Sequence, residues 1–296
     1  MLTGCGTALV TPFRGGEVDG DALRRLVRRQ VAAGVDFLVP LGSTAETPCL
    51  TDEEKVFILK TVREEAPGLP LIAGVGTNSL IHTVRNLRLL EGCGADGWLV
   101  VVPYYNKPTQ EGMYRYFRAV ADETDKPVVL YNVPGRTGSH MAAETTLRIA
   151  RDAANVVAVK EASGRPEQME ALLKGRQEDF SVLSGEDAEV LEVVLAGAQG
   201  IISVASNVAP AEEMALLRAA FRARKGDAAG LEEARALYAA LAPLYAGCFI
   251  ESNPIPVKAA LSLLGLCSDE MRLPLTPAVA ATRERLKEVL RGLKML

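Results

Sequence analysis

The residue best suited to chemistry in this sequence is a lysine at the end of a short apolar run. Lys160 ends "NVVAVK" in the stretch "NVVAVKEASG" (residues 155–164), which otherwise has the composition of a strand buried on both faces. A buried ammonium group loses hydration, so it must be paired or give up its proton. A neutral amine in an apolar pocket can attack a ketone and form a Schiff base. The alternative is structural, an ion pair between Lys160 and Glu161 or another acid.

Other candidate residues carry hydroxyl groups or a positive charge, and each also has an ordinary structural explanation. Tyr131 interrupts the apolar run "PVVLYN" and is either a core residue or a proton carrier beside Lys160. Arg136 in "VPGRTG" can bind a carboxylate through two parallel hydrogen bonds, or be a solvated surface charge. Ser43 and Thr44 in "LGSTAET" can bind an anion, although both residue types are common in turns. Together these residues indicate Schiff-base chemistry on a small oxo-acid.

The elements that must position these side chains are eight short β-rich runs that alternate with helical patterns. The runs begin near residues 7, 35, 69, 95, 127, 155, 180 and 200. Continuously apolar strands that alternate with helices predict a parallel sheet covered by those helices. Eight such units in the first 224 residues predict a (β/α)8 TIM barrel, in which the chemistry lies at the C-terminal ends of the strands. An open doubly wound sheet is disfavoured, because no G-x-G-x-x-G follows the first run.

The remainder of the chain shows helical patterns only. We therefore divide it into a catalytic barrel, residues 1–224, and a C-terminal helical extension, residues 225–296, with the turn "KGDAAG" between them. Within the barrel, "SGED" follows the seventh run, where barrels often bind phosphate. Glu186 and Asp187 would repel such an anion, which disfavours a phosphorylated substrate.

Composition narrows the functional classes. The 296 residues have a net charge of −4 without long charged runs, so we expect no nucleic-acid or membrane partner. Five separated cysteines without a C-x-x-C pair indicate reduced thiols rather than disulfides or a zinc site, and we expect no metal ligands. No run approaches the roughly 20 apolar residues of a membrane span, and the N-terminal residues do not resemble a signal peptide. These features predict a cytoplasmic protein.

Several motifs, in this order and spacing, resemble one known family across nearly the whole chain. They are "LGSTAE", "VVPYYNKPTQEG", "YNVPGRTG", "VVAVKEASG", "LSGED" and "ESNPIPVK". The chain resembles the pyruvate-dependent class I aldolase superfamily and, within it, the 4-hydroxy-tetrahydrodipicolinate (dihydrodipicolinate) synthase family. The resemblance implies a lyase in which pyruvate forms an imine on Lys160 without any other cofactor. The enamine then attacks L-aspartate 4-semialdehyde, and the product feeds lysine and diaminopimelate biosynthesis.

The resemblance also implies roles for individual residues. Thr44, Tyr131 and Tyr105 would form a proton relay, with Tyr105 supplied to the neighbouring subunit across a tight dimer. The implied assembly is a homo-oligomer, a dimer of dimers that forms a homotetramer. The substrate-binding residues would hold the carboxylates of pyruvate and of the semialdehyde and line the pocket; they are Ser43, Thr44, Arg136, Gly185 and Ile202.

Feedback-sensitive members of this family bind lysine at the dimer interface, and only part of that site matches here. Asn78 and Tyr104 keep the asparagine and tyrosine of the site. Lys55 stands at the position of a histidine, and His82 at the position of a glutamate. The resemblance therefore predicts weak or absent inhibition by L-lysine.

Two departures from the family's usual pattern leave other functions open. Ser43 and Ala45 stand where the synthases usually carry threonine and glycine, and Ala45 fits only if its φ is not positive. One alternative is a pyruvate aldolase that cleaves N-acetylneuraminate or a 2-keto-3-deoxy sugar acid. Arg136 argues against it, because a polyol chain prefers neutral partners. The second alternative is a non-catalytic barrel that binds an oxo-acid. The presence of Lys160, Tyr131 and Thr44 together argues against it.

Overall fold

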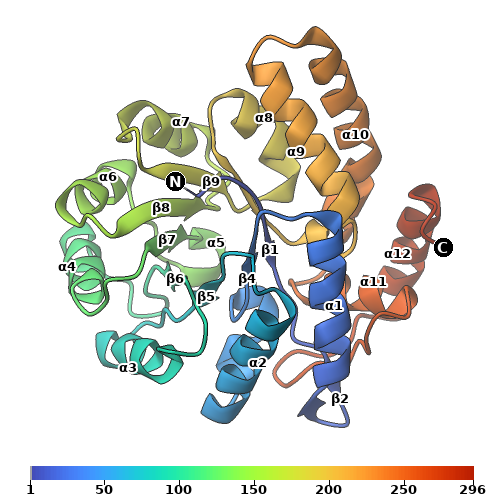
Figure 1. Ribbon diagram of the computed structural model, residues 1–296, viewed down its shortest axis with the longest axis horizontal. Coiled ribbons are helices and arrows are strands. Elements are labelled where there is room, and N and C mark those ends of the chain that lie inside the picture. The colour runs from blue at the N-terminus through green and yellow to red at the C-terminus, as the bar shows by residue number, and fades with distance from the viewer. Residues whose placement is uncertain (1) are drawn as a thin grey trace.

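A computed structural model describes residues 2–296, and its centre is a parallel barrel (Figure 1). The strands are β1 (Gly4–Ala8), β4 (Phe37–Val39), β5 (Ile72–Gly74), β6 (Gly97–Val101), β7 (Val128–Asn132), β8 (Val156–Glu161), β9 (Ser181–Ser184) and β10 (Gly200–Ser203). They pair in the order β4-β1-β10-β9-β8-β7-β6-β5. A parallel bridge between Leu38 of β4 and Leu71, the residue before β5, closes the barrel. The predicted (β/α)8 barrel is confirmed.

Helices form the outer layer around these strands. They are α1 (Gly20–Ala33), α2 (Asp52–Glu65), α3 (Leu80–Leu90), α4 (Gln110–Ala121), α6 (Ala143–Asp152), α7 (Pro166–Gly175), α8 (Val190–Leu195) and α9 (Pro210–Arg224). The one-turn helix α5 (Pro134–Thr137) lies inside this ring instead (Figure 1). Local signals in the sequence explain where several begin. Thr51 and Glu54, for example, form a reciprocal capping box at the start of α2.

Two details of the first strand region differ from the sequence pattern. β1 begins at Gly4, three residues before the apolar run near residue 7, because its pairing partner β10 extends to Gly200. After β1 the chain forms a small hairpin of β2 (Phe13–Arg14) and β3 (Glu17–Val18), joined by two glycines with positive φ. Two-residue strands carry too few side chains for an alternating pattern to be visible in the sequence.

The C-terminal residues form α10 (Ala228–Gly247), α11 (Ile255–Leu263) and α12 (Ala280–Gly292). The turn between α9 and α10 is shorter than "KGDAAG", because α10 already begins at Ala228. In Figure 1, α10 lies beside α9, and α12 packs against both α10 and α11. The division at residues 224 and 225 remains our proposal for the domain organisation.

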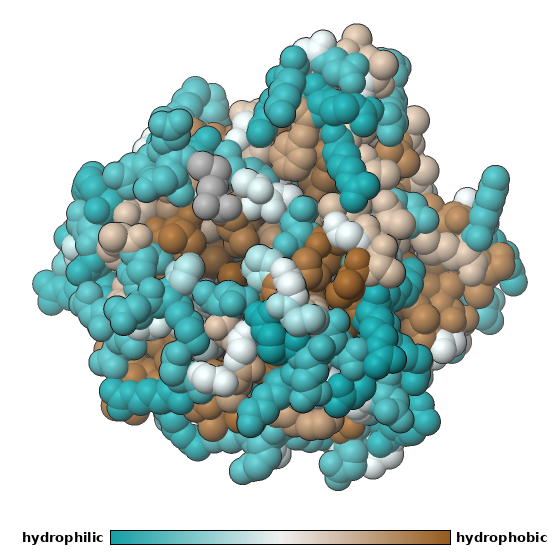
Figure 2. Space-filling view, in the orientation of Figure 1, coloured by the Kyte–Doolittle hydropathy of each residue, from teal (hydrophilic) through white to brown (hydrophobic). Residues whose placement is uncertain are grey.

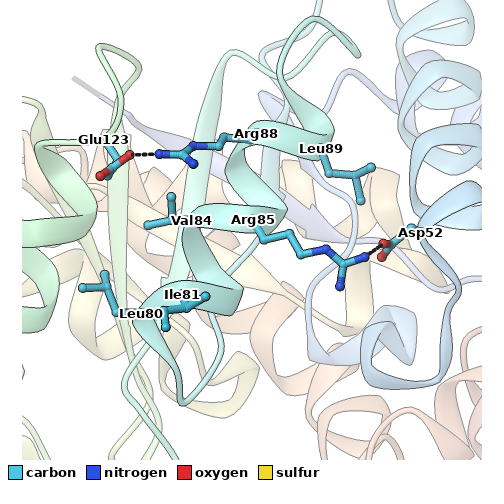
Figure 3. A pocket seen from close by; sticks show the side chains of 8 residues that line it. All are labelled: Asp52, Leu80, Ile81, Val84, Arg85, Arg88, Leu89 and Glu123. Carbon is cyan, nitrogen blue, oxygen red and sulfur yellow. Dashed lines mark hydrogen bonds and ion pairs between the residues drawn. The ribbon is translucent and has the colours of Figure 1, made fainter.

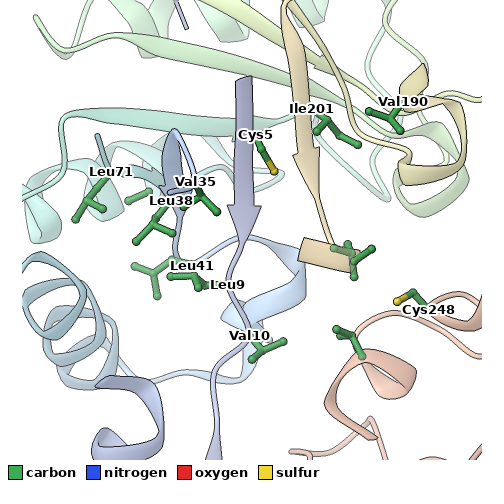
Figure 4. Close-up of a cluster of buried hydrophobic side chains, with 14 of the residues drawn as sticks. Cys5, Leu9, Val10, Val35, Leu38, Leu41, Leu71, Val190, Ile201 and Cys248 are labelled. Carbon is green, nitrogen blue, oxygen red and sulfur yellow. The ribbon is translucent and has the colours of Figure 1, made fainter. Parts of the chain in front are cut away.

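Apolar side chains fill two regions on either side of the barrel wall. One cluster lies inside the barrel and includes Phe37, Val39, Leu99, Leu183 and Ile202. The larger cluster lies between strands and helices, and Figure 4 shows part of it, with Cys5 on β1 and Cys248 after α10. All five cysteines are free. Packing on both faces makes the strands a rigid base for side chains at their C-terminal ends.

The surface is mainly hydrophilic around the helical rim, whereas apolar residues show at the centre and over the side near α11 and α12 (Figure 2). Within residues 2–296, every helix is too short or too polar to cross a bilayer.

Candidate active site

Lys160 lies near the C-terminal end of β8, directly opposite Tyr131 of β7 in the strand register. Its side chain is buried, and Nζ is 4.4 Å from the centroid of the Tyr131 ring. Glu161 does not pair with it, because its carboxylate accepts hydrogen bonds from Asn132 (2.9 Å) and Gln168 (3.2 Å). Among residues 2–296, no acid forms an ion pair with Lys160. The structural explanation for this lysine, a pair with Glu161, is therefore wrong.

A cavity of about 470 Å³ opens beside this lysine. Ser43, Tyr131 and Arg136 line it, as do Tyr104 and Lys55. The structure thus brings one predicted catalytic residue, Tyr131, and two predicted substrate-binding residues, Ser43 and Arg136, to one cavity. Thr44 and Lys160 are not part of its lining and are almost fully buried. Tyr131 connects the two sets, because it lines the cavity and its ring contacts the lysine ammonium.

Thr44 is held by a residue that we did not select from the sequence. Nδ2 of Asn253 donates a hydrogen bond of 2.9 Å to Thr44 Oγ1, and Asn253 itself lines the cavity. The backbone carbonyl of Asn253 accepts a hydrogen bond of 3.3 Å from Arg136 Nη1. Asn253 therefore contacts two predicted site residues. The only signal in the sequence was its place in "ESNPIPVK", far from the barrel strands.

Two consecutive 3₁₀ turns present Ser43 and Thr44 after β4. They cover Ser43–Ala45 and Thr47–Cys49, and Glu46 between them has a φ of 54°. The left-handed residue is thus Glu46 and not Ala45, so the extra Cβ of Ala45 is accommodated. Thr11 Oγ1 donates a hydrogen bond of 2.8 Å to the carbonyl of Ala45, which ties this loop to the segment that follows β1.

Gly185 follows β9 and approaches Lys160 closely. A Cβ on Gly185 would lie 2.6 Å from Ala162 Cβ and 2.9 Å from Lys160 Cε, so only glycine fits without movement. Burial raises the pKa of the next residue, Glu186, to about 7, although the positive charges of Lys160 and Arg136 oppose that shift. Ile202 is fully buried inside the barrel.

Tyr105 does not join the other predicted catalytic residues within one subunit. Its side chain is 88% exposed and does not line the cavity. Its backbone has a φ of 71°, and its N–H donates to the carbonyl of Thr137 at 3.2 Å. A left-handed conformation is uncommon for a bulky residue and marks a position held by its surroundings.

Only two of the four residues matched to the feedback site for L-lysine line the same cavity. Lys55 and Tyr104 line the cavity, and Nζ of Lys55 is 3.2 Å from Asp52 Oδ1. The carbonyl of Asn78 accepts a hydrogen bond of 2.9 Å from Asn106 Nδ2. His82 is exposed on α3 and does not line the cavity.

A second hollow, of about 650 Å³, lies on the outer helical layer (Figure 3). Its charged groups are already paired, Arg85 with Asp52 at 2.5 Å and Arg88 with Glu123 at 2.9 Å. The remaining lining residues are apolar: Leu80, Ile81, Val84 and Leu89. It contains no candidate nucleophile, so the barrel cavity is the candidate active site.

The sequence is similar to a known family over almost its whole length. The sequence model of the Dihydrodipicolinate synthetase family matches residues 1–293. A 4-hydroxy-tetrahydrodipicolinate synthase from Thermotoga neapolitana is 46% identical over 295 residues, 98% of each chain. Another from Chlorobium phaeobacteroides is also 46% identical, over 297 residues, covering 100% of this chain and 98% of the relative.

Solved structures show the same likeness in three dimensions. The dihydrodipicolinate synthase crystal structure from Thermotoga maritima superposes with a TM-score of 0.96 at 43% identity, over 100% of both chains. The enzyme from Cyanidioschyzon merolae, solved with lysine bound, gives a TM-score of 0.94 at 37% identity over 99% of both chains. With a family model that spans almost every residue and a barrel that matches throughout, this chain belongs to the dihydrodipicolinate synthetase family.

Proposed function

We propose that this chain catalyses the aldol condensation of pyruvate with L-aspartate 4-semialdehyde to give 4-hydroxy-tetrahydrodipicolinate, through an imine on Lys160. The reaction is that of the family to which the chain belongs, and it is a lyase activity. One observation carries the mechanism: Lys160 is buried and lies 4.4 Å from the ring of Tyr131, and no acid among residues 2–296 pairs with it. An amine that is not engaged in an ion pair is available as a nucleophile.

The chemistry balances without an added cofactor. The neutral amine of Lys160 attacks the ketone carbon of pyruvate, and loss of one water gives the imine. Removal of a methyl proton gives the enamine, whose carbon attacks the aldehyde carbon of the semialdehyde while the new alkoxide takes up a proton. The amino group of the semialdehyde then displaces Lys160 from the imine carbon and closes the ring. Each step moves a proton, which is the task of positioned hydroxyl groups.

Tyr131 and Thr44 are the proposed proton carriers within one subunit. The contact of the Tyr131 ring with the lysine ammonium supports the first role. The role of Thr44 is supported by the hydrogen bond from Asn253, which fixes the Thr44 hydroxyl in the same 3₁₀ turn that carries Ser43.

The substrate carboxylates have separate proposed sites. Ser43 and Thr44 bind the pyruvate carboxylate, and Arg136 binds the carboxylate of the semialdehyde. The position of Ser43 and Arg136 in the same cavity wall supports this division. Gly185 and Ile202 are the residues we propose to line the substrate pocket through their backbones, and the close approach of Gly185 to Lys160 supports the first of these roles. The family match removes the main support for cleavage of N-acetylneuraminate or sugar acids and for a non-catalytic oxo-acid binder.

The assembly we propose is a tight dimer in which Tyr105 completes the neighbouring subunit's relay, with two dimers forming a tetramer. The support is an 88% exposed tyrosine with a left-handed backbone, which is a costly arrangement for a residue that only meets solvent. A monomeric dihydrodipicolinate synthase variant with 43% identity and a TM-score of 0.96 shows that this fold also exists as a single subunit. We also place the protein in the cytoplasm, which its five free cysteines favour.

An assay of the purified chain with both substrates tests the function. We expect product formation that requires both pyruvate and L-aspartate 4-semialdehyde, and that is lost in Lys160→Ala. N-acetylneuraminate and 2-keto-3-deoxy sugar acids should not release pyruvate. Activity with a sugar acid alone would overturn the proposal.

A further inference from the structure

A fully buried ion pair connects the C-terminal helices with the loop that carries Ser43 and Thr44. Nζ of Lys258, on α11, is 2.7 Å from Oε1 of Glu46, and neither side chain has any exposed surface. Glu46 stands between the two 3₁₀ turns of the loop, two residues after Thr44. The pair thus joins positions more than 200 residues apart in the sequence at the edge of the active site.

Both charges have further partners, so the pair has one defined geometry. Oε2 of Glu46 accepts a hydrogen bond of 3.0 Å from the backbone N–H of Arg272. Nζ of Lys258 lies 4.3 Å from the centroid of the Phe13 ring, and Cζ of Arg272 lies 4.5 Å from the same ring. Burial lowers the pKa of Lys258, and the neighbouring Glu46 carboxylate counteracts that shift.

Stability alone is a poor explanation for such a pair. Removing two charges from water costs about as much as their attraction returns, and apolar residues in their place are often neutral or stabilising. A fully satisfied buried pair does, however, select one conformation over others. The conformation at issue here is the left-handed one of Glu46, at φ 54°, which sets the direction of the loop.

We propose that Lys258 is a positioning residue for the Thr44 hydroxyl, acting through Glu46, and that Asn253 of the same C-terminal segment completes this support. Glu46 fixes the loop backbone, and Nδ2 of Asn253 donates to Thr44 Oγ1. Because the Thr44 oxygen accepts this bond, its own hydrogen is free to point toward another acceptor. The C-terminal segment therefore orients the hydroxyl as a proton donor. This inference rests on the proposed function.

The test is the double variant Glu46→Gln, Lys258→Met, which removes both charges together and leaves neither unpaired. Its readouts are the borohydride-trapped label on Lys160 with pyruvate, and the exchange of pyruvate methyl hydrogens in D₂O measured by NMR. We expect trapping at the wild-type level, because Lys160 is untouched, and methyl exchange and kcat that are slower by about tenfold or more. The KM for pyruvate should change much less than kcat.

Glu213→Gln is the matched control. Glu213 is also a fully buried carboxyl, hydrogen-bonded at 2.8 Å to the hydroxyl of Tyr245, and it lies outside the cavity lining. If Glu213→Gln lowers the melting temperature but exchanges pyruvate methyl hydrogens at the wild-type rate, then lost stability by itself does not slow the proton relay. If the double variant does not fold, Asn253→Ala tests the same proposal through the bond to Thr44.

The outcomes separate the two claims. Exchange within twofold of wild type in the folded double variant, or in Asn253→Ala, overturns the positioning role. Equal slowing in Glu213→Gln overturns it as well. Failure of the wild-type chain to exchange pyruvate hydrogens or to be labelled at Lys160 is instead a failure of the proposed function.

Discussion

Nδ2 of Asn253 donates a hydrogen bond of 2.9 Å to Oγ1 of Thr44, across 209 positions of sequence. The barrel mouth is thus completed by the segment between α10 and α11, not only by the loops that follow the strands. Asn253 also holds Arg136 through its backbone carbonyl. A change in the C-terminal segment can therefore reach both the proposed relay and the proposed carboxylate site.

Gly185→Ala should impair imine formation without unfolding the barrel. The new Cβ would lie 2.9 Å from Lys160 Cε and 2.6 Å from Ala162 Cβ, so the lysine must move. We expect kcat/KM to fall by at least about tenfold, which corresponds to about 1.4 kcal/mol of transition-state stabilisation. Gly68→Ala is the control, because nothing lies within 4 Å of its added Cβ. Equal activity of the two variants in steady-state assays would contradict this close approach.

Glu186→Gln should change how stability depends on pH. The pKa of Glu186 is raised from 4.5 to about 7 by burial, so the folded chain retains a proton that the unfolded chain has released. Stability is therefore lost as pH rises from about 5 to about 7 and levels off above that. Glutamine does not titrate, so the wild-type melting temperature should fall relative to that of the variant across this window. Parallel melting-temperature curves from pH 5 to 8 would disprove the shift.

L-lysine should inhibit the enzyme weakly or not at all. Lys55 lines the cavity with Tyr104, and His82 is exposed, so a cationic inhibitor meets an ammonium and lacks the glutamate of feedback-sensitive relatives. Like charges about 4 Å apart at an effective dielectric near 20 repel by about 4 kcal/mol. Activity titrated with L-lysine checks this.

The control for the lysine prediction is the double variant Lys55→His, His82→Glu, which should gain sensitivity. Half-inhibition of the wild-type chain by L-lysine well below about 1 mM would refute the charge argument. A dissociation constant below that concentration corresponds to a binding free energy larger than about 4 kcal/mol.

Tyr105→Phe chains should regain activity when mixed with Lys160→Ala chains. Each variant alone lacks one part of every site, but a mixed dimer contains one site with both Lys160 and the partner's tyrosine. Random mixing restores about one quarter of wild-type sites. Subunit exchange is verified by mass spectrometry of the intact assembly. Complete exchange without activity would rule out a shared site.

The barrel and the position of Lys160 could be predicted from the sequence because each depends on local patterns. Apolar runs that alternate with helices predict the barrel. Because Lys160 ends one of these runs, it is expected at the C-terminal end of a buried strand. The contact between Lys160 and Tyr131 follows from adjacent strands in parallel register.

The roles of Asn253 and Lys258 could not be predicted in that way. They depend on where the C-terminal segment folds back onto the barrel, and no periodicity in residues 225–296 encodes that direction. Lys258 lies within the helical pattern of α11, where a lysine is ordinarily on the solvated face. The sequence around its partner Glu46 does not mark that residue as buried either. Only the folded chain shows that both side chains are fully buried.

The central claim is that Lys160 forms the imine with pyruvate. Incubation with pyruvate and sodium borohydride, followed by peptide mass spectrometry, tests it most directly. We expect a stable pyruvate-derived addition on Lys160 that is absent from Lys160→Ala and from samples without pyruvate. An unmodified Lys160, or the addition on another lysine such as Lys55 or Lys258, would contradict it.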